Sequence, residues 1–168
     1  MKHLILTDMK KLFYLFIMSL IFSACSLKSE TDVSPRITYS DFRVNGDSIA
    51  HQDTLFVGDT LQFAVSLNGY YNELTKLNVN PETDYITFSL CDSATASAFI
   101  NEDLTDASAG KYIFKSSIYS CAFPVQIVAK QAKQEAVSLK FSLTSSSELK
   151  DGNPCTSSLS FKVVAAKD

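Results

Sequence analysis

Four aspartates recur at a spacing of six residues and are the first candidates for chemistry, because carboxylates can bind calcium. They are Asp41, Asp47, Asp53 and Asp59. Calcium needs several oxygens converging on one point, usually from a D-x-D-x-D-G loop, and the chain has no such loop. Aspartates near turns commonly cap their own backbone instead. We therefore expect turn-capping aspartates, with no metal and no cofactor.

Catalytic motifs are also missing. The 168 residues include two histidines, His3 and His51, so few side chains titrate near neutral pH. No G-x-S-x-G elbow, P-loop or H-E-x-x-H motif occurs. We predict that the chain is not an enzyme. Composition leaves one alternative open, a small envelope carbohydrate-active hydrolase with two carboxylates about 5–10 Å apart.

Three cysteines follow in the second half of the chain: Cys91, Cys121 and Cys155. Three thiols permit three single pairings, and each pairing leaves one thiol over. A disulfide is permissible in an oxidising envelope compartment, and free cysteines can equally serve as small buried hydrophobes. A zinc site would need a fourth ligand near them, and none is close in sequence. Disulfide and buried thiols both remain open.

Tyr70 and Tyr71 lie in a loop over residues 68–72. Exposed aromatic rings can stack on sugars or on a partner protein, so we predict both as ligand contacts. The lack of tryptophan weakens the case for a carbohydrate-binding platform. The alternative is that one tyrosine packs down as a lid and the other has no role.

The N-terminal segment decides where these residues would act. Lys10 and Lys11 precede an apolar run over residues 12–22, and Ser23-Ala24-Cys25 follows. This order is typical of a secretory signal ending at small residues. The run is too short for a membrane helix, which needs about 20 residues.

This segment resembles the bacterial lipoprotein signal, in which the cysteine after the cut carries the lipid. Phe22 stands where that family usually has leucine, a looser form common among Bacteroidetes lipoproteins. The resemblance implies a signal peptide over 1–24, lipid on Cys25, and an outer-membrane location on the periplasmic or surface face. An ordinary cleaved signal is the alternative.

The next residues, 25–35, are polar and end in proline, a composition that predicts a flexible tether. Residues 36–168 then form one domain of ordinary size. The net charge is −3 and becomes more negative once the lysine-rich signal is removed. Nucleic-acid binding, which needs a basic face, is therefore not expected, nor is docking on anionic lipid.

Alternating apolar and polar residues, the pattern of half-buried strands, dominate this domain. Turn residues separate the runs. The stretch over 92–110 is ambiguous between a helix and a long loop. About seven to nine short strands predict an all-β sandwich or barrel. The expected strands are 37–44, 54–57, 61–67, 74–79, 86–90, 111–118, 121–129, 137–143 and 159–163.

Two parts of this pattern resemble bacterial immunoglobulin-like and PKD-like domains. Residues 58–65 and 74–79 look like their B and C strands, and residues 139–144, 151–153 and 158–164 look like their closing hairpin. The resemblance implies an immunoglobulin-like antiparallel β-sandwich. The chain departs from true immunoglobulin domains because no tryptophan is present for cysteines to frame. A small lipocalin-like barrel is the second choice.

Four Asp-(Ser/Thr)-apolar tripeptides resemble the O-glycosylation signal of Bacteroidetes envelope proteins. Their hydroxyl residues are Ser48, Thr54, Thr60 and Ser93. We predict a non-catalytic lipoprotein that binds a glycan or an envelope protein and is held at the membrane through its lipid. A structural pilus-like or adhesin subunit is a further alternative, and it would expose an unpaired strand edge.

Overall fold

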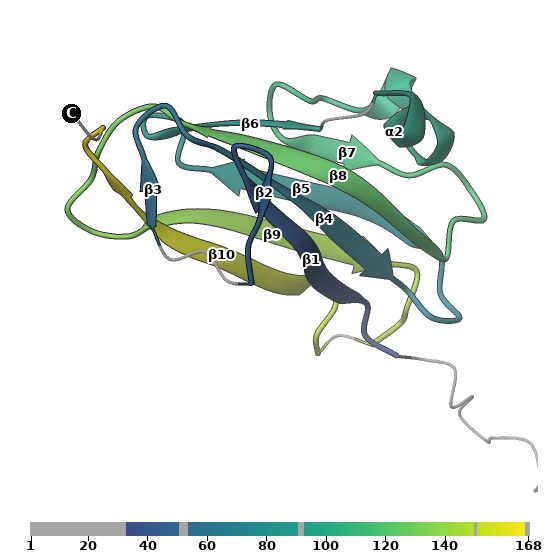
Figure 1. Ribbon diagram of the computed structural model, residues 1–168. Helices are drawn as coiled ribbons and strands as arrows, with labels where there is room; N and C mark the ends of the chain where they lie inside the picture. The colour runs from purple at the N-terminus through teal and green to yellow at the C-terminus, as the bar shows by residue number, and fades with distance from the viewer. Residues whose placement is uncertain (1–32, 51–53, 91–92, 150, 167–168) are drawn as a thin grey trace, which may run out of the picture. The chain divides into compact units, whose positions relative to one another are not determined.

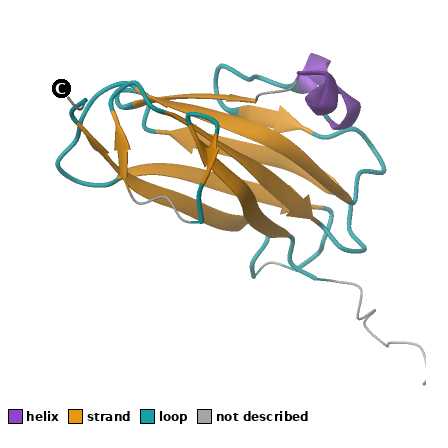
Figure 2. Cartoon of the chain, viewed as in Figure 1, coloured by secondary structure: helices purple, strands orange, loops and turns teal. Residues whose placement is uncertain are grey.

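The computed structural model describes residues 33–50, 54–90, 93–149 and 151–166, without the side chains of residues 93–95. All of these belong to one compact unit, Thr31–Asp168. The described chain is mostly strand (Figures 1 and 2). No described helix is long and apolar enough to cross a membrane.

The strands form two five-stranded sheets. The first has the order β2 (Asp47–Ser48), β1 (Arg36–Val44), β4 (Thr60–Asn68), β8 (Ser120–Ala129), β6 (Ile86–Leu90). The second has the order β3 (Thr54–Phe56), β10 (Cys155–Val164), β9 (Val137–Ser145), β5 (Leu74–Pro81), β7 (Lys111–Ile113). The two sheets remain separate among the described strands, so the fold is a sandwich and not a closed barrel.

The strand order is that of an immunoglobulin-like sandwich. Strands β1-β4-β8-β6 follow the order A-B-E-D, and β10-β9-β5 follow G-F-C. One pair departs from the antiparallel prediction, since strand β3 pairs parallel with β10. Strand β7 pairs antiparallel with β5 in the second sheet, although β6, which comes between them in the sequence, belongs to the first sheet.

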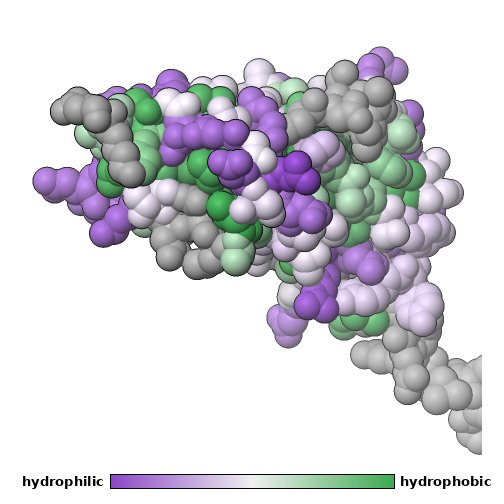
Figure 3. Space-filling view, in the orientation of Figure 1, coloured by the Kyte–Doolittle hydropathy of each residue, from purple (hydrophilic) through white to green (hydrophobic). Residues whose placement is uncertain are grey.

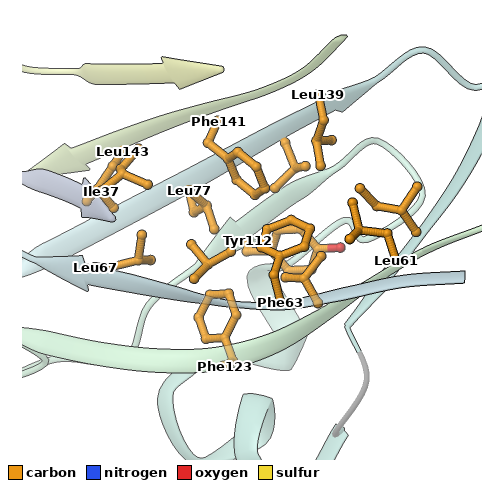
Figure 4. Packing of buried hydrophobic residues seen from close by; sticks show 14 of the residues in the cluster. Ile37, Leu61, Phe63, Leu67, Leu77, Tyr112, Phe123, Leu139, Phe141 and Leu143 are labelled. Carbon is orange, nitrogen blue, oxygen red and sulfur yellow. The ribbon is translucent and has the colours of Figure 1, made fainter. Parts of the chain in front are cut away.

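Alternation along the strands explains the core. Every second residue of β4 from Leu61 to Leu67 is buried, because successive side chains of a strand point to opposite faces. Strand β9 repeats the pattern from the other sheet. Phe63 and Phe141 are among the largest fully buried side chains, and each stabilises the fold by about 1.5–3 kcal/mol relative to exposure. Figure 4 shows the two inner faces packing together.

Two predicted strands differ from the structure, and the ambiguous stretch takes a definite form. The strand expected over 111–118 ends at Ile113, and β10 begins at Cys155, before the expected Leu159. After Cys155, the first residues of β10 are all small and polar (Thr156, Ser157 and Ser158). They therefore lack the apolar–polar alternation by which the other strands were predicted. The ambiguous stretch contains a short helix, α2 (Ser93–Phe99), and a 3-10 turn, η1 (Glu102–Leu104). Helix α2 ends at Phe99 because the next residue, Ile100, pairs with Phe114 in a β-bridge.

The first residues described are already part of the folded unit. Pro35 is buried, the Ser34 hydroxyl donates to the Asp151 carbonyl at 3.1 Å, and Asn72 donates to the Val33 carbonyl at 3.4 Å. Residues 33–35 were expected in the tether and are instead packed. Strand β10 ends at the opposite end of the sandwich from this entry point (Figure 1).

Candidate functional site

Tyr70 has an unusual backbone conformation at the start of the β4–β5 loop. Its φ is 57°, in the left-handed region that costs a non-glycine residue about 1–3 kcal/mol. Its N–H donates to the Asn68 side chain at 2.7 Å, and Asn72 N–H closes the turn on the Gly69 carbonyl at 2.9 Å. Strained residues of this kind often cluster at binding sites.

Close backbone packing explains the glycine before it. A Cβ on Gly69 would lie 2.2 Å from the Asn72 carbonyl oxygen, which no side chain can tolerate. The turn therefore depends on Gly69 for space and on Asn68 for its hydrogen bond. These local contacts fix the direction in which Tyr70 leaves the sheet.

A groove of about 550 Å³ lies beside Tyr70 on the outer face of the first sheet, within the size range of small-ligand sites. Its lining comes from β1, β4, β8 and the loop residue Tyr70. The lining residues are Arg36, Thr38, Ser66, Leu67, Asn68, Tyr70, Ser120, Cys121 and Ala122.

Strand register brings these residues together in rows. Arg36 lies opposite Asn68, which lies opposite Ser120; in the next row Thr38, Ser66 and Ala122 are partners. Residues directly opposite one another across a sheet have neighbouring side chains. The middle of the face has small side chains and its end has Arg36 and Tyr70, so the surface is hollowed. Figure 3 shows polar and apolar residues mixed over the face in view.

The groove offers hydrogen-bonding groups and one ring, but no acid or base. Its hydroxyls, the Asn68 amide and the Arg36 guanidinium can donate or accept bonds to a polar ligand. Tyr70 is 40 % exposed as a whole residue, and its ring can offer an apolar face. No carboxylate or histidine is among the lining residues. The arrangement suits binding of a hydroxyl-rich molecule and supplies no general acid or base of the usual kinds.

Two further cavities flank β6. One of about 360 Å³ lies between β6 and α2 and is largely apolar, with Phe88, Leu90 and Tyr112 in its lining. The other, of about 510 Å³, shares Phe88 and reaches Lys130. Glu102 is the one carboxylate residue among the lining residues of these two cavities. Neither therefore holds the carboxylate pair that the hydrolase alternative would need.

The two predicted tyrosine contacts separate in the structure. Tyr70 lines the groove, whereas Tyr71 does not and is 70 % exposed. Sequence reasoning did not identify Arg36, Thr38, Ser66 or Ser120. One feature of the sequence could have indicated them. At the solvent-facing positions of these strands, small hydroxyl residues such as Thr38, Ser66 and Ser120 take the place of the charged residues that are common there.

The cysteines form no disulfide among the described residues. Cys121 and Cys155 are free thiols, and Cys91 and Cys25 lie outside the described residues. Burial raises the pKa of the Cys121 thiol to about 12. Cys121 is therefore a buried thiol of low reactivity, and Cys155 is half-buried. For Cys91, disulfide and buried thiol both stay predictions.

Of the aspartate series, Asp59 shows the predicted turn chemistry, whereas Asp47 lies in the short strand β2. Asp59 accepts the Phe56 N–H at 2.8 Å and the Asn45 amide at 2.7 Å. Asp41 accepts the Ser40 hydroxyl at 2.9 Å, and Asp53 lies outside the described residues, as does His51. No group of three metal-ligating side chains occurs in the part of the chain that the structure describes.

The predicted glycosylation residues differ in their exposure to solvent. Ser48 and Thr54 are exposed, and Thr60 is half-buried at the start of β4. The side chain of Ser93 is outside the described residues. Exposure leaves Ser48 and Thr54 accessible to modification, and their glycosylation stays a prediction.

Comparison with known proteins assigns the chain to no family. No protein-family profile matches the chain, and no curated protein matches. Among solved structures, the chain is similar to the C-terminal domain of the Streptococcus pyogenes antigen I/II-family protein AspA, with 16 % identity and a TM-score of 0.44. The match covers 77 % of this chain and 46 % of that structure. The assignment to a sandwich rests on the two sheets themselves.

Proposed function

We propose that the protein is a non-catalytic binding module of the cell envelope, anchored by lipid on Cys25, whose groove beside Tyr70 binds a glycan. The observation that carries the binding site is Tyr70, held in a strained conformation at the edge of a polar groove without carboxylates. The alternative partner is an envelope protein whose hydroxyl-rich surface could form the same kinds of hydrogen bonds with the groove. The anchor comes from the resemblance of residues 10–25 to Bacteroidetes-type lipoprotein signals.

The groove matches a sugar in two ways. A pyranose has an apolar face of C–H groups that can pack on the Tyr70 ring. Its hydroxyls can exchange bonds with Thr38, Ser66, Ser120 and the Asn68 amide, and Arg36 adds donors in a planar fork. A ligand that left these groups unpaired would lose affinity, because desolvated polar groups are costly.

An anchor would make weak binding useful. A lipid-held domain meets ligands on the same surface at a raised effective concentration. Open polar grooves bind with modest affinity because water already satisfies their groups. The combination favours a module that works beside other envelope proteins on a shared glycan.

Binding to an array of bacterial and host oligosaccharides, followed by calorimetry on the positive ligands, tests the groove. We expect Tyr70→Ala and Arg36→Ala to weaken binding at least about tenfold, which corresponds to about 1.4 kcal/mol. Tyr71→Ala is the matched control, since its ring lies outside the groove, and should bind as the wild type does. Equal binding by all four proteins would overturn the assignment.

The open edge of β10 favours a second function. Strand β3 pairs with β10 only at Lys162–Val164, and from Cys155 to Phe161 the outer edge has no ladder partner among the described strands. Such an edge can accept a strand, as the pilus-like alternative requires. Sedimentation over a wide concentration range tests this. Assembly through a second copy would support it, and a monomer throughout would contradict it.

A further inference from the structure

The large exposed hydrophobic side chains gather at one end of the sandwich. Among the described residues these are Tyr70, Tyr71, Leu104, Tyr119 and Leu149. All except Leu104 lie in the β4–β5, β7–β8 and β9–β10 loops. Exposed aromatic and apolar residues concentrated in one place mark an interaction surface more strongly than scattered ones do.

Hydrogen bonds hold these three loops together. Gly69 N–H donates to the Tyr119 carbonyl at 2.8 Å, and Leu74 N–H donates to the Ile118 carbonyl at 2.6 Å. On the other side, Ser146 N–H donates to the Glu73 carbonyl at 2.8 Å, and Glu73 N–H donates to the Ser146 hydroxyl at 2.9 Å. The loops therefore present one ordered surface, which we call the tyrosine end (Tyr71, Tyr119 and Leu149). Tyr70 is assigned to the groove.

The chain enters the folded unit at this same end. Val33 accepts the Asn72 amide and Ser34 donates to the Asp151 carbonyl, so the entry point lies between the β4–β5 and β9–β10 loops. Seven residues lie between Cys25 and Val33, so the Cα atoms of these two residues are at most about 29 Å apart even in a fully extended chain.

A lipid on Cys25 would therefore keep the tyrosine end within a short distance of the bilayer. Tyrosine is enriched at membrane–water interfaces, because its ring prefers the apolar side and its hydroxyl the wet side. The Tyr119 hydroxyl already has a polar partner in the Glu73 carboxylate, at 3.4 Å.

Charge gives no preference for anionic lipid. Among the described residues, the loops of this end and the start of β1 carry Glu73, Glu148 and Asp151 against Arg36 and Lys115, and the sequence of the β9–β10 loop adds Lys150. Acidic and basic residues are therefore equal in number, and this end lacks the basic cluster that anionic headgroups attract. A zwitterionic surface suits such a balanced end, where the ring and leucine contacts supply the attraction.

We propose that the tyrosine end rests on a zwitterionic phospholipid surface, with Tyr71, Tyr119 and Leu149 in the headgroup region. This inference rests on the proposed lipid anchor at Cys25. It fixes the orientation of the domain: the groove opens sideways close to the membrane, and the β5–β6 and β8–β9 loops point away from it.

Tryptophan fluorescence tests the orientation cleanly, because the chain has no tryptophan. Tyr71→Trp places a reporter at the tyrosine end. Gln134→Trp, in the exposed β8–β9 loop, is the matched control at the opposite end. The mature lipidated proteins are reconstituted into phosphatidylcholine vesicles, with and without brominated lipid, and circular dichroism confirms the fold of each.

We expect both variants to float with the vesicles, and bromolipid to quench the Tyr71→Trp reporter several-fold more than the Gln134→Trp reporter. Replacing part of the lipid with anionic phosphatidylglycerol should leave that difference unchanged, and a marked increase would show that anionic headgroups are the preferred surface. If both float and quench equally, the orientation is wrong while the anchor stands. If neither floats and neither carries lipid by mass, the anchor itself is wrong and the orientation falls with it.

Discussion

Asn68 accepts the backbone N–H of Tyr70 at 2.7 Å, and this bond holds the tyrosine at the edge of the groove with a φ of 57°. The two residues connect the sheet to the loop. Asn68 ends β4 and lies opposite Arg36 and Ser120, while Tyr70 begins the loop that leaves it. A strained residue is thus joined to the row of polar side chains that would bind the ligand.

The strained backbone at Tyr70 predicts that a glycine variant is more stable than an alanine variant at this position. Alanine in the left-handed region keeps the steric cost, whereas glycine adopts it freely. Tyr70→Gly should therefore unfold at a higher denaturant midpoint than Tyr70→Ala, by about 1 kcal/mol in free energy of unfolding. Both variants lose the ring and should lose ligand binding alike. Equal stability of the two would show that the loop relaxes out of the left-handed conformation.

Asn153 closes the β9–β10 hairpin with both ends of its amide. Its oxygen accepts the Ser145 N–H at 3.1 Å, and its nitrogen donates to the carbonyls of Ser145 and Ser147 at 3.0 and 2.9 Å. Asn153→Asp turns the donor into a charged acceptor facing two carbonyls. We expect a loss of about 2 kcal/mol or more in free energy of unfolding.

Urea unfolding of the Asn153→Asp variant measures that loss. Asn80→Asp, at an exposed site on β5, is the control and should change stability by less than about 0.5 kcal/mol. Similar effects at both positions would contradict a bridging role for Asn153.

Glu82 joins two loops at the other end of the sandwich. It accepts Lys133 Nζ at 2.6 Å and the Ser138 N–H at 2.9 Å, and Lys133 also lies 5.0 Å from the centre of the Tyr85 ring. The hydrogen bond from Lys133 is the main cause that lowers the pKa of Glu82 below its ordinary 4.5.

A carboxyl whose pKa is lower in the folded state stabilises the protein above its unfolded pKa, and the effect is lost as pH falls through the folded value. The stability of the wild type should decline below about pH 4.5, and Glu82→Gln should flatten part of that decline. Thermal unfolding between neutral pH and pH 3 measures it, with Glu102→Gln on η1 as control. An unchanged slope in Glu82→Gln would refute the contribution.

The buried thiol of Cys121 should make the protein lose stability as the pH rises, the opposite direction to Glu82. Burial raises the pKa of its thiol from 9.0 to about 12, so the folded state holds the proton more tightly. The stabilisation is complete below pH 9.0 and is lost as pH rises towards about 12. Burial also raises the pKa of Tyr39 and Tyr112, which adds to the alkaline loss.

Unfolding measured from pH 8 upward in the wild type and in Cys121→Ala separates the thiol from the tyrosines. The variant should lose stability less steeply with pH, even if it is less stable overall because of the cavity it creates. In the folded wild type at neutral pH, a thiol reagent should modify half-buried Cys155 well before Cys121. Fast modification of Cys121 would contradict its burial.

The strands were predictable because burial imposes a period of two. Residues 61–67 and 137–143 alternate strictly, and both became inward-facing central strands. Sequence could not locate the start of β10, since Thr156, Ser158 and Ser160 face solvent and Ser157 lies between them. Such residues suit a strand or a loop equally well, and only the pairing with β9 decides.

The candidate site was less predictable, for a geometric reason. Tyr70 stood out as an aromatic residue in a loop, but its partners depend on register across three strands. Arg36, Asn68 and Ser120 are far apart in the chain and meet because β1, β4 and β8 align them. The same limit hid the entry of the chain between two loops, which depends on Asn72 and Ser34.

Cys25 is the residue on which the proposed anchored envelope module depends. Membrane fractionation in the native host, with intact-mass spectrometry, compares the wild type with Cys25→Ala. We expect a membrane-bound wild type that begins at Cys25 and carries a lipid-sized added mass, with both features lost in the variant. A soluble product of unmodified mass from both genes would contradict the proposed anchor.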